Sequence, residues 1–192
     1  LKDAYPENPD YLRGYSVSLE RLAGIYKAMN QLDNALQYYQ EDLEISKQLK
    51  DAYPENPDYL RDYFVSLNQI AGIYKAMNQL DDALKCYQDG LEISRQLKAA
   101  YPENPNYLWD YSVSLNQLAV IYESLNQLND ALQYYQEETE IFMQLKDTYS
   151  ENPSYLRGYS IALNQLTGVY NAMNQVPKGH KEPKFINKKS FK

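Results

Sequence analysis

The sequence LKDAYPENPDYL, residues 1–12, returns almost unchanged at residues 49–60, 97–108 and 145–156. Each copy begins 48 positions after the one before it, and most of the rest of the unit repeats with it. A fixed period of this size is typical of solenoids, in which each unit buries its apolar surface against its neighbours instead of folding alone. The repeat therefore predicts a stacked array with a linear core shared between units.

Each unit carries two helical stripes of apolar residues. Asn8-Pro9 has the features of a helix start, with Asn as the N-cap and Pro at the first helical position. Asn30 tolerates the left-handed conformation that ends many helices, and Asp33 is expected to cap the second helix. The first stripe advances in steps of three and four positions through Leu12, Tyr15, Leu19, Leu22, Tyr26 and Met29.

The same pattern predicts an all-α fold of about seven helices and no strands. We expect helices near residues 9–29, 33–53, 57–77, 81–101, 105–125, 129–149 and 153–175. Short connections make consecutive helices antiparallel. The array is expected over residues 1–176, with units at 8–55, 56–103 and 104–151 and a half-unit at 152–176.

Residues 177–192 break the pattern. Two Pro, one Gly and six Lys do not sustain an amphipathic helix, so a disordered basic tail is expected there. The formal charge of the whole chain is −7, and the tail carries six Lys and one Glu, which leaves −12 on residues 1–176. An acidic array argues against a nucleic-acid partner, because nucleic acid requires a basic surface.

Cysteine and hydropathy exclude other classes. Cys86 is the only cysteine, so neither a disulfide framework nor a cysteine-based metal site is expected. No stretch approaches the roughly 18 apolar residues that cross a bilayer, and no signal peptide is visible. The chain begins with Leu1 inside a unit, which indicates a fragment of a longer array. We expect a cytoplasmic protein without membrane attachment.

The paired helices resemble the tetratricopeptide repeat (TPR). That family places a bulky residue, a Leu, a small residue and a Tyr along its first helix, then a turn residue, a small residue and an aromatic. In the first unit these positions hold Leu19, Leu22, Ala23, Tyr26, Asn30, Ala35 and Tyr39, and the next two units repeat the pattern. The resemblance implies an α-solenoid of antiparallel helix pairs with a right-handed superhelix, whose first helices line a concave peptide-binding groove.

The unit departs from the family in length. It spans 48 positions where the family's unit spans 34, an excess of about two turns in each helix, and so it is most similar to kinesin light chain arrays. The small position late in the second helix is assigned to Asp42, Gly90 and Thr139, where looser packing is expected.

Two columns of amides on successive first helices are the strongest candidates for a binding site. By the resemblance they face the groove. An amide offers both a donor and an acceptor, so it can pair with a peptide backbone of any sequence. The alternative is that these side chains only keep an exposed face hydrated. The two columns are Asn68, Asn116 and Asn164, and Gln69, Gln117 and Gln165.

Three further positions add charge and an aromatic ring. Lys27 and Lys75 are expected on the groove wall, and Glu123 takes the same column in the third unit, so the groove could run from basic to acidic. Trp109 stands where other units have Arg, a column that is expected to be exposed. An exposed Trp is a common binding hot spot, although it could equally lie across a neighbouring helix end.

The sequence predicts a protein- or peptide-binding module and no enzyme. The one His, in the tail, has no His or Cys partner for a metal, and the seven Gly form no phosphate loop. We expect no cofactor. The alternative is a structural spacer or a rod that associates end to end, since near-identical units present near-identical end faces. A sensor that drives an attached domain is a third possibility.

Overall fold

The computed structural model describes residues 8–175, so the predicted tail, 177–192, lies outside the described residues. Within them the chain forms helices only. Every predicted helix is present, and the ends differ from the expected ones by no more than a single position. The helices are α1 (Pro9–Ala28), α2 (Leu32–Ala52), α3 (Pro57–Ala76), α4 (Leu80–Ala100), α5 (Pro105–Ser124), α6 (Leu128–Thr148) and α7 (Pro153–Gln175).

The repeated Asn and Pro residues set these boundaries. The Asn8 side chain accepts hydrogen bonds from the backbone N–H groups of Asp10 and Tyr11, as an N-cap should. The turns between paired helices have a left-handed Asn in every described unit, namely Asn30, Asn78 and Asn126 with φ of 58°, 60° and 58°. One prediction is wrong. Asp33 lies inside the first turn of α2, and Gln31 holds the N-cap position without a side-chain cap.

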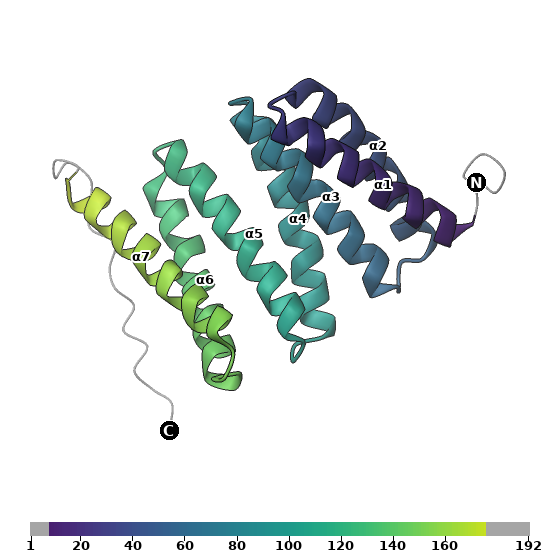
Figure 1. The fold of residues 1–192 in the computed structure, drawn as a ribbon. Coiled ribbons are helices and arrows are strands. Elements are labelled where there is room, and N and C mark those ends of the chain that lie inside the picture. Colours follow the sequence, from purple (N-terminus) through teal and green to yellow (C-terminus); the bar gives the residue numbers. More distant parts are fainter. Residues whose placement is uncertain (1–7, 176–192) are drawn as a thin grey trace.

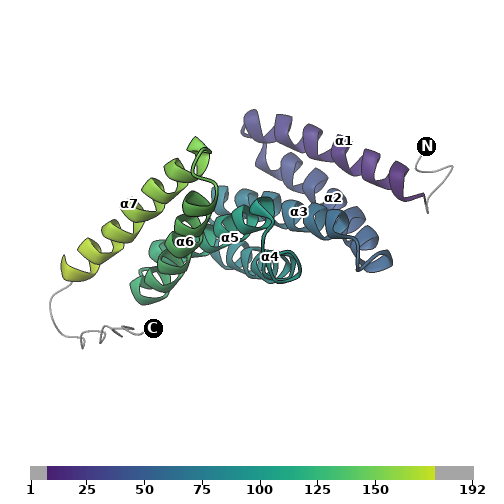
Figure 2. The same cartoon turned by 90° about the horizontal axis from the view of Figure 1, so that it is seen from below.

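Consecutive helices pack side by side along the array. Each described helix contacts the helix before it and the helix after it in the chain. The first helices, α1, α3, α5 and α7, lie towards the viewer in Figure 1, and α2, α4 and α6 lie behind them. Figure 2 shows that the array is bent, with α1 and α7 at its two ends. The prediction of an all-α solenoid is confirmed.

Small residues and tyrosines build the core between helices. Ala23 of α1 and Ala35 of α2 are fully buried at their crossing, as are Ala71 with Ala83 and Ala119 with Ala131. Packing two alanines at each crossing lets the helix pair approach closely. Tyr39, Tyr87 and Tyr135 fill the space beside these alanines and are at most 3% exposed.

None of the described helices combines the length and hydropathy that a bilayer-crossing segment requires.

Candidate functional site

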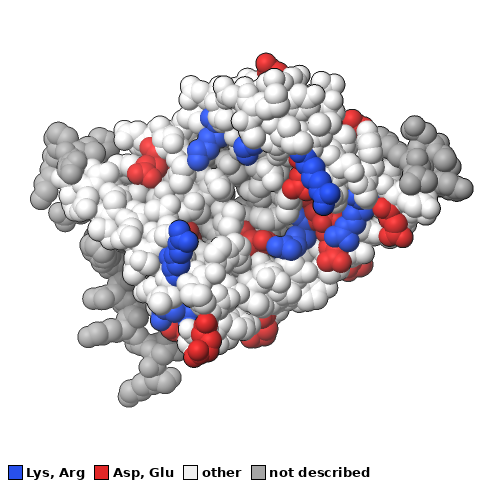
Figure 3. All heavy atoms as spheres, viewed as in Figure 1, with Lys and Arg blue, Asp and Glu red and all other residues white. Residues whose placement is uncertain are grey.

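The face formed by α1, α3, α5 and α7 is the candidate binding surface. In space-filling view this face is hollowed near its middle, and several Lys and Arg side chains lie around the hollow (Figure 3). Asp and Glu side chains lie beside them on the same face, so the hollow is bordered by charges of both signs (Figure 3).

Polar contacts between consecutive first helices join a residue to the one 49 positions later. Arg13 Nε of α1 lies 2.7 Å from Asp62 Oδ2 of α3. One unit further on, Arg61 Nε lies 2.6 Å from Asp110 Oδ2 of α5. In both pairs a second guanidinium nitrogen also donates, at 3.2 Å, so each pair is bidentate. The ion pairs therefore hold neighbouring units in one register.

The predicted amides follow the same offset. Asn116 Nδ2 of α5 donates to Gln165 Oε1 of α7 at 2.9 Å. In the first unit Glu20 replaces the amide, and Gln69 of α3 hydrogen-bonds to its carboxylate. Burial is the main cause that raises the pKa of Glu20, and the Asp42 carboxylate raises it further. Contacts at these positions thus join α1 to α3 and α5 to α7.

A buried acidic column lies behind the amides on the second helices. The assignment of the small position to Thr139 was wrong, because the residue 48 positions after Gly90 is Glu138. Asp42 and Glu138 are only 4% and 3% exposed. Asp42 accepts from the hydroxyls of Ser16 and of Ser66, the latter at 2.7 Å. Burial raises the pKa of Asp42, and this effect outweighs the two hydrogen bonds, which lower it.

Glu138 is held by an amide of the predicted site. Asn116 Nδ2 lies 3.1 Å from both of its carboxylate oxygens. Desolvation raises the pKa of Glu138 to about 7, because one neutral donor replaces the hydration of the charge only in part. A single amide therefore joins α5, α6 and α7 through Asn116, Glu138 and Gln165.

The remaining amides have less uniform surroundings. Asn68 is half-buried, donates to the backbone carbonyl of Phe64 at 2.8 Å, and covers the space above Gly90. Gln117 is half-buried, whereas Asn164 is exposed on α7. The structure thus gives the predicted amides a different arrangement in each unit. Whether these residues bind a peptide stays a prediction.

Lys27, Lys75 and Glu123, the charged residues of the predicted site, lie in the last turns of α1, α3 and α5. The Lys27 ammonium of α1 reaches across to Gly72 of α3, where it would lie 3.6 Å from an added Cβ. Lys75 is half-buried at the end of α3. Glu123 of α5 is exposed and accepts a hydrogen bond from the Tyr135 hydroxyl at 3.0 Å.

Trp109 packs between α5, α6 and α7. The prediction that its column is exposed is wrong at this position, because Trp109 is half-buried. Its ring meets Phe142 edge-on at 5.3 Å between centroids and lies 6.0 Å from Tyr155. Of the two alternatives for Trp109, the structure shows the one in which it lies across neighbouring helices.

Tyrosine hydroxyls link the first helix to its paired second helix in the first and third units, a pattern that the sequence did not predict. Tyr15 donates to Glu41 at 2.8 Å, and Tyr111 donates to Glu137 at 2.5 Å. The signal was visible as two columns that recur with the period of the unit, one of Tyr and one of acidic side chains. Cys86 stands in another Tyr column, and burial raises its pKa to about 11, which leaves the thiol poorly nucleophilic.

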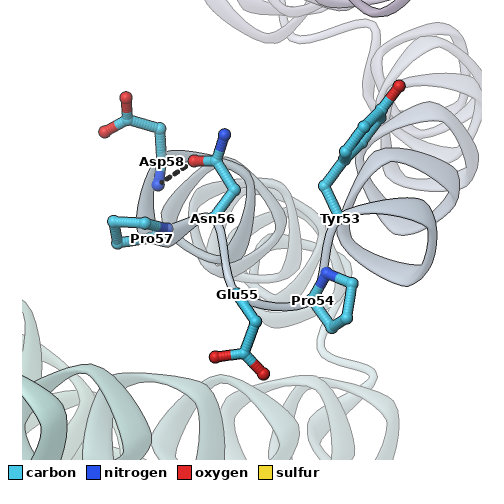
Figure 4. Close-up of a pocket in the computed structure, with 6 residues that line it drawn as sticks. All are labelled: Tyr53, Pro54, Glu55, Asn56, Pro57 and Asp58. Atoms are coloured by element: carbon cyan, nitrogen blue, oxygen red, sulfur yellow. Dashed lines mark hydrogen bonds between the residues drawn. The ribbon is translucent and has the colours of Figure 1, made fainter.

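One surface depression lies away from this face. Tyr53, Pro54, Glu55, Asn56, Pro57 and Asp58 line it (Figure 4). Tyr53, Pro54, Glu55 and Asn56 form the connection between α2 and α3, Pro57 and Asp58 begin α3, and most of the six are exposed. Figure 4 shows the Asn56 side chain capping the backbone of Asp58, so its amide oxygen already serves the helix. Among residues 8–175 no group of His, Cys, Asp and Glu is arranged to hold a metal ion.

Two family models, both described as tetratricopeptide repeat, match the chain. One covers residues 62–144 and the other residues 18–53, and together they cover more than half of the sequence. The comparison with curated proteins found no match.

Solved structures share the fold at low identity. The apo form of RapI is 18% identical with a TM-score of 0.66, over 90% of this chain and 54% of RapI. BtubC (BKLC) from P. vanneervenii is 18% identical with a TM-score of 0.54, over 95% of this chain and 73% of BtubC. The kinesin light chain-related repeats of a Podospora anserina protein are 21% identical with a TM-score of 0.48, over 88% and 90%. This chain spans about half the length of RapI, and the likenesses show the fold alone.

Proposed function

Because the chain belongs to the tetratricopeptide repeat family, whose fold is generally a protein-interaction module, we propose that it binds an extended segment of a partner protein. The segment lies along the hollowed face of α1, α3, α5 and α7. The observation that supports the proposal is the pair of amide columns that recurs on the first helices α3, α5 and α7.

The spacing of the amides suits a peptide backbone. Packed helices lie about 8–10 Å apart, and an extended chain advances about 3.3 Å per residue. Amides on neighbouring first helices would therefore meet the backbone at every third peptide unit or less often. Asn68 and Asn116 use their Nδ2 groups inside the array, which leaves their carbonyl oxygens as acceptors for peptide N–H groups. Asn164 is exposed and offers both a donor and an acceptor.

The charges give the segment a direction. Lys27 lies over α3 and Lys75 ends that helix, whereas Glu123 ends α5. A bound segment with an acidic residue near α3 and a basic residue near α5 would pair with these lysines and with Glu123. Reversing the segment would bring like charges together, so the orientation is selected by repulsion as well as by attraction.

A peptide selection on the full chain tests the proposal. Binders chosen from a random linear library are measured against Asn164→Ala, and then against a triple variant in which Asn68 and Asn116 also become Ala. We expect about a fivefold loss for the single variant and at least a fiftyfold loss for the triple, from roughly 1 kcal/mol per hydrogen bond. Helical content and unfolding are recorded for each variant, because Asn116 also holds Glu138.

The matched control changes three exposed glutamines on the second helices to Ala, namely Gln48, Gln96 and Gln144. This control should bind like the parent chain. Unchanged affinity in a folded triple Asn variant would rule out the amide columns as the binding site.

The second candidate function is a spacer or a self-associating rod, because both ends of the array expose apolar side chains. Ile25 on α1 is 57% exposed and Leu156 on α7 is 56% exposed. The ion pairs argue against an end-to-end rod. If α7 of one copy packed on α1 of the next as consecutive first helices pack within the chain, Arg157 would face Gly14, which has no carboxylate. Sedimentation over a range of concentrations separates the two, because a rod grows with concentration in the absence of a partner.

A further inference from the structure

Within residues 8–175, the last first helix, α7, lacks the second helix that covers each of the other first helices. Leu19, Leu67 and Leu115 are at most 4% exposed, whereas Leu163 in the same column is 38% exposed. The covering residues are known from the earlier pairs. Leu12 and Leu19 of α1 lie in one apolar cluster with Ile45 and Leu49 of α2.

The uncovered face also has a polar determinant. In α1 and α5 the corresponding tyrosine donates to a carboxylate on the paired second helix. Tyr159 of α7 stands in this tyrosine column. Lys146 of α6 lies 5.4 Å from the centre of the Tyr159 ring, as Lys98 of α4 lies 3.9 Å from that of Tyr111. In the third unit the Tyr111 hydroxyl and the Lys98 ammonium lie near the Glu137 carboxylate. Tyr159 and Lys146 provide the same two groups at α7.

The sequence that follows α7 does not repeat the second helix in this register. Phe185 stands in the column of the Glu137 carboxylate, and Lys189 stands in the column of Ile141. Pro183 stands in the column of Tyr39, Tyr87 and Tyr135. Residues 176–192 therefore do not repeat the α2 pattern in this register.

We propose that the uncovered face of α7 binds an amphipathic helix of a partner protein, which presents a carboxylate to Tyr159 and Lys146 and two aliphatic side chains to Leu156 and Leu163. The aliphatic residues follow the carboxylate at the fourth and eighth positions, as Ile45 and Leu49 follow Glu41. None of these four residues belongs to the amide columns, so the proposal does not rest on the extended peptide proposed above.

The sequence of α2 itself is the natural probe, because α7 repeats the residues by which α1 contacts α2, namely Leu12, Tyr15, Ser16 and Leu19. A labelled peptide of residues 32–52 is titrated onto the full chain, and binding is followed by fluorescence anisotropy and by circular dichroism. An isolated helix of this length is marginally stable, so docking should raise its helical content. We expect saturable binding.

Variants at the two ends of the array locate the contact. Leu163→Glu and Leu156→Glu should each weaken binding at least tenfold, and both sites are exposed enough to leave the fold intact. Ile25→Glu, an equally exposed change at the other end, should leave binding unchanged. Loss of binding in Ile25→Glu with retention in Leu163→Glu would place the peptide on α1 and overturn the proposal.

The carboxylate contact has its own test. Tyr159→Phe in the chain and Glu41→Gln in the peptide should each weaken binding about tenfold, and Tyr159→Phe should add little to the loss once Glu41 is Gln, because the charged acceptor of its hydrogen bond is already gone. Additive losses would contradict the pairing.

Two further results would overturn the assignment of a partner helix. A Leu163-dependent dimer of the chain alone would identify a second copy as the occupant. A more than tenfold gain in peptide affinity on deleting residues 177–192 would identify the chain's own segment. Absence of peptide binding up to millimolar concentration would also refute the proposal.

Discussion

The first two junctions between first helices are polar, whereas the third is aromatic. Arg13 pairs with Asp62, and Arg61 pairs with Asp110, each across two units. At the third junction the corresponding residues are Trp109 and Gly158. The indole packs on Phe142, which stands in a column that holds serine in the other units.

The difference shows that near-identical units are not interchangeable. Three columns change together at one place: Arg becomes Trp, Ser becomes Phe, and Asp becomes Gly. Gly158 is buried against Phe142, and an added Cβ would overlap the phenyl ring. The Phe142 ring thus requires glycine at position 158, so the substitutions at positions 142 and 158 depend on each other.

Restoring the repeat residue at Gly158 should break the aromatic junction. Gly158→Asp forces the Phe142 ring aside and leaves a buried carboxylate without an arginine, so we expect a loss of about 4 kcal/mol in the free energy of unfolding. Urea denaturation measures it. Adding Trp109→Arg and Phe142→Ser should recover at least half of the loss. Failure of the triple variant to recover would mean that the three columns are independent.

A second prediction concerns the pH dependence of the same junction. The folded-state pKa of Glu138 is about 7, above its ordinary value of 4.5, so between these values the folded chain keeps a proton that the unfolded chain has lost. Stability contributed by this group therefore falls as pH rises from about 4.5 to 7, by about 3 kcal/mol in total.

Glu138→Gln removes this dependence. The variant should be more stable than the parent at pH 8, by up to about 3 kcal/mol, and similar to it at pH 4. Urea midpoints at both pH values give the comparison. Equal stability of the two chains at pH 8 would show that the buried carboxylate is better solvated than its contacts indicate.

The two polar junctions should differ from each other by a smaller amount. The Asp110 side chain is 9% exposed, whereas that of Asp62 is 32% exposed. Arg61→Ala strands a buried carboxylate and should cost about 2 kcal/mol, but Arg13→Ala should cost less than about 1 kcal/mol because water replaces the partner. Denaturation of the two matched variants tests this, and equal losses would contradict the dependence on burial.

The sequence was sufficient for the helices and insufficient for the contacts between them. Helix ends follow from Asn-Pro starts and left-handed Asn turns, which act locally and recur in each unit. Contacts between consecutive first helices join residues 49 positions apart, one more than the repeat length. This spacing depends on how the neighbouring helices are shifted along their axes, which local sequence patterns do not determine. The burial of Asp42 and Glu138 could not be predicted, because acidic side chains are rarely buried and a small residue was expected at this position.

The single tryptophan makes the last junction observable by itself. In a linear array the end helix has one neighbour, so α7 should detach at lower denaturant concentration than the central helices. Trp109 emission reports the environment of that contact, and circular dichroism averages over the whole chain. A red shift of the Trp109 emission at a lower denaturant concentration than the loss of ellipticity would therefore report the unfolding of this end of the array without any added label.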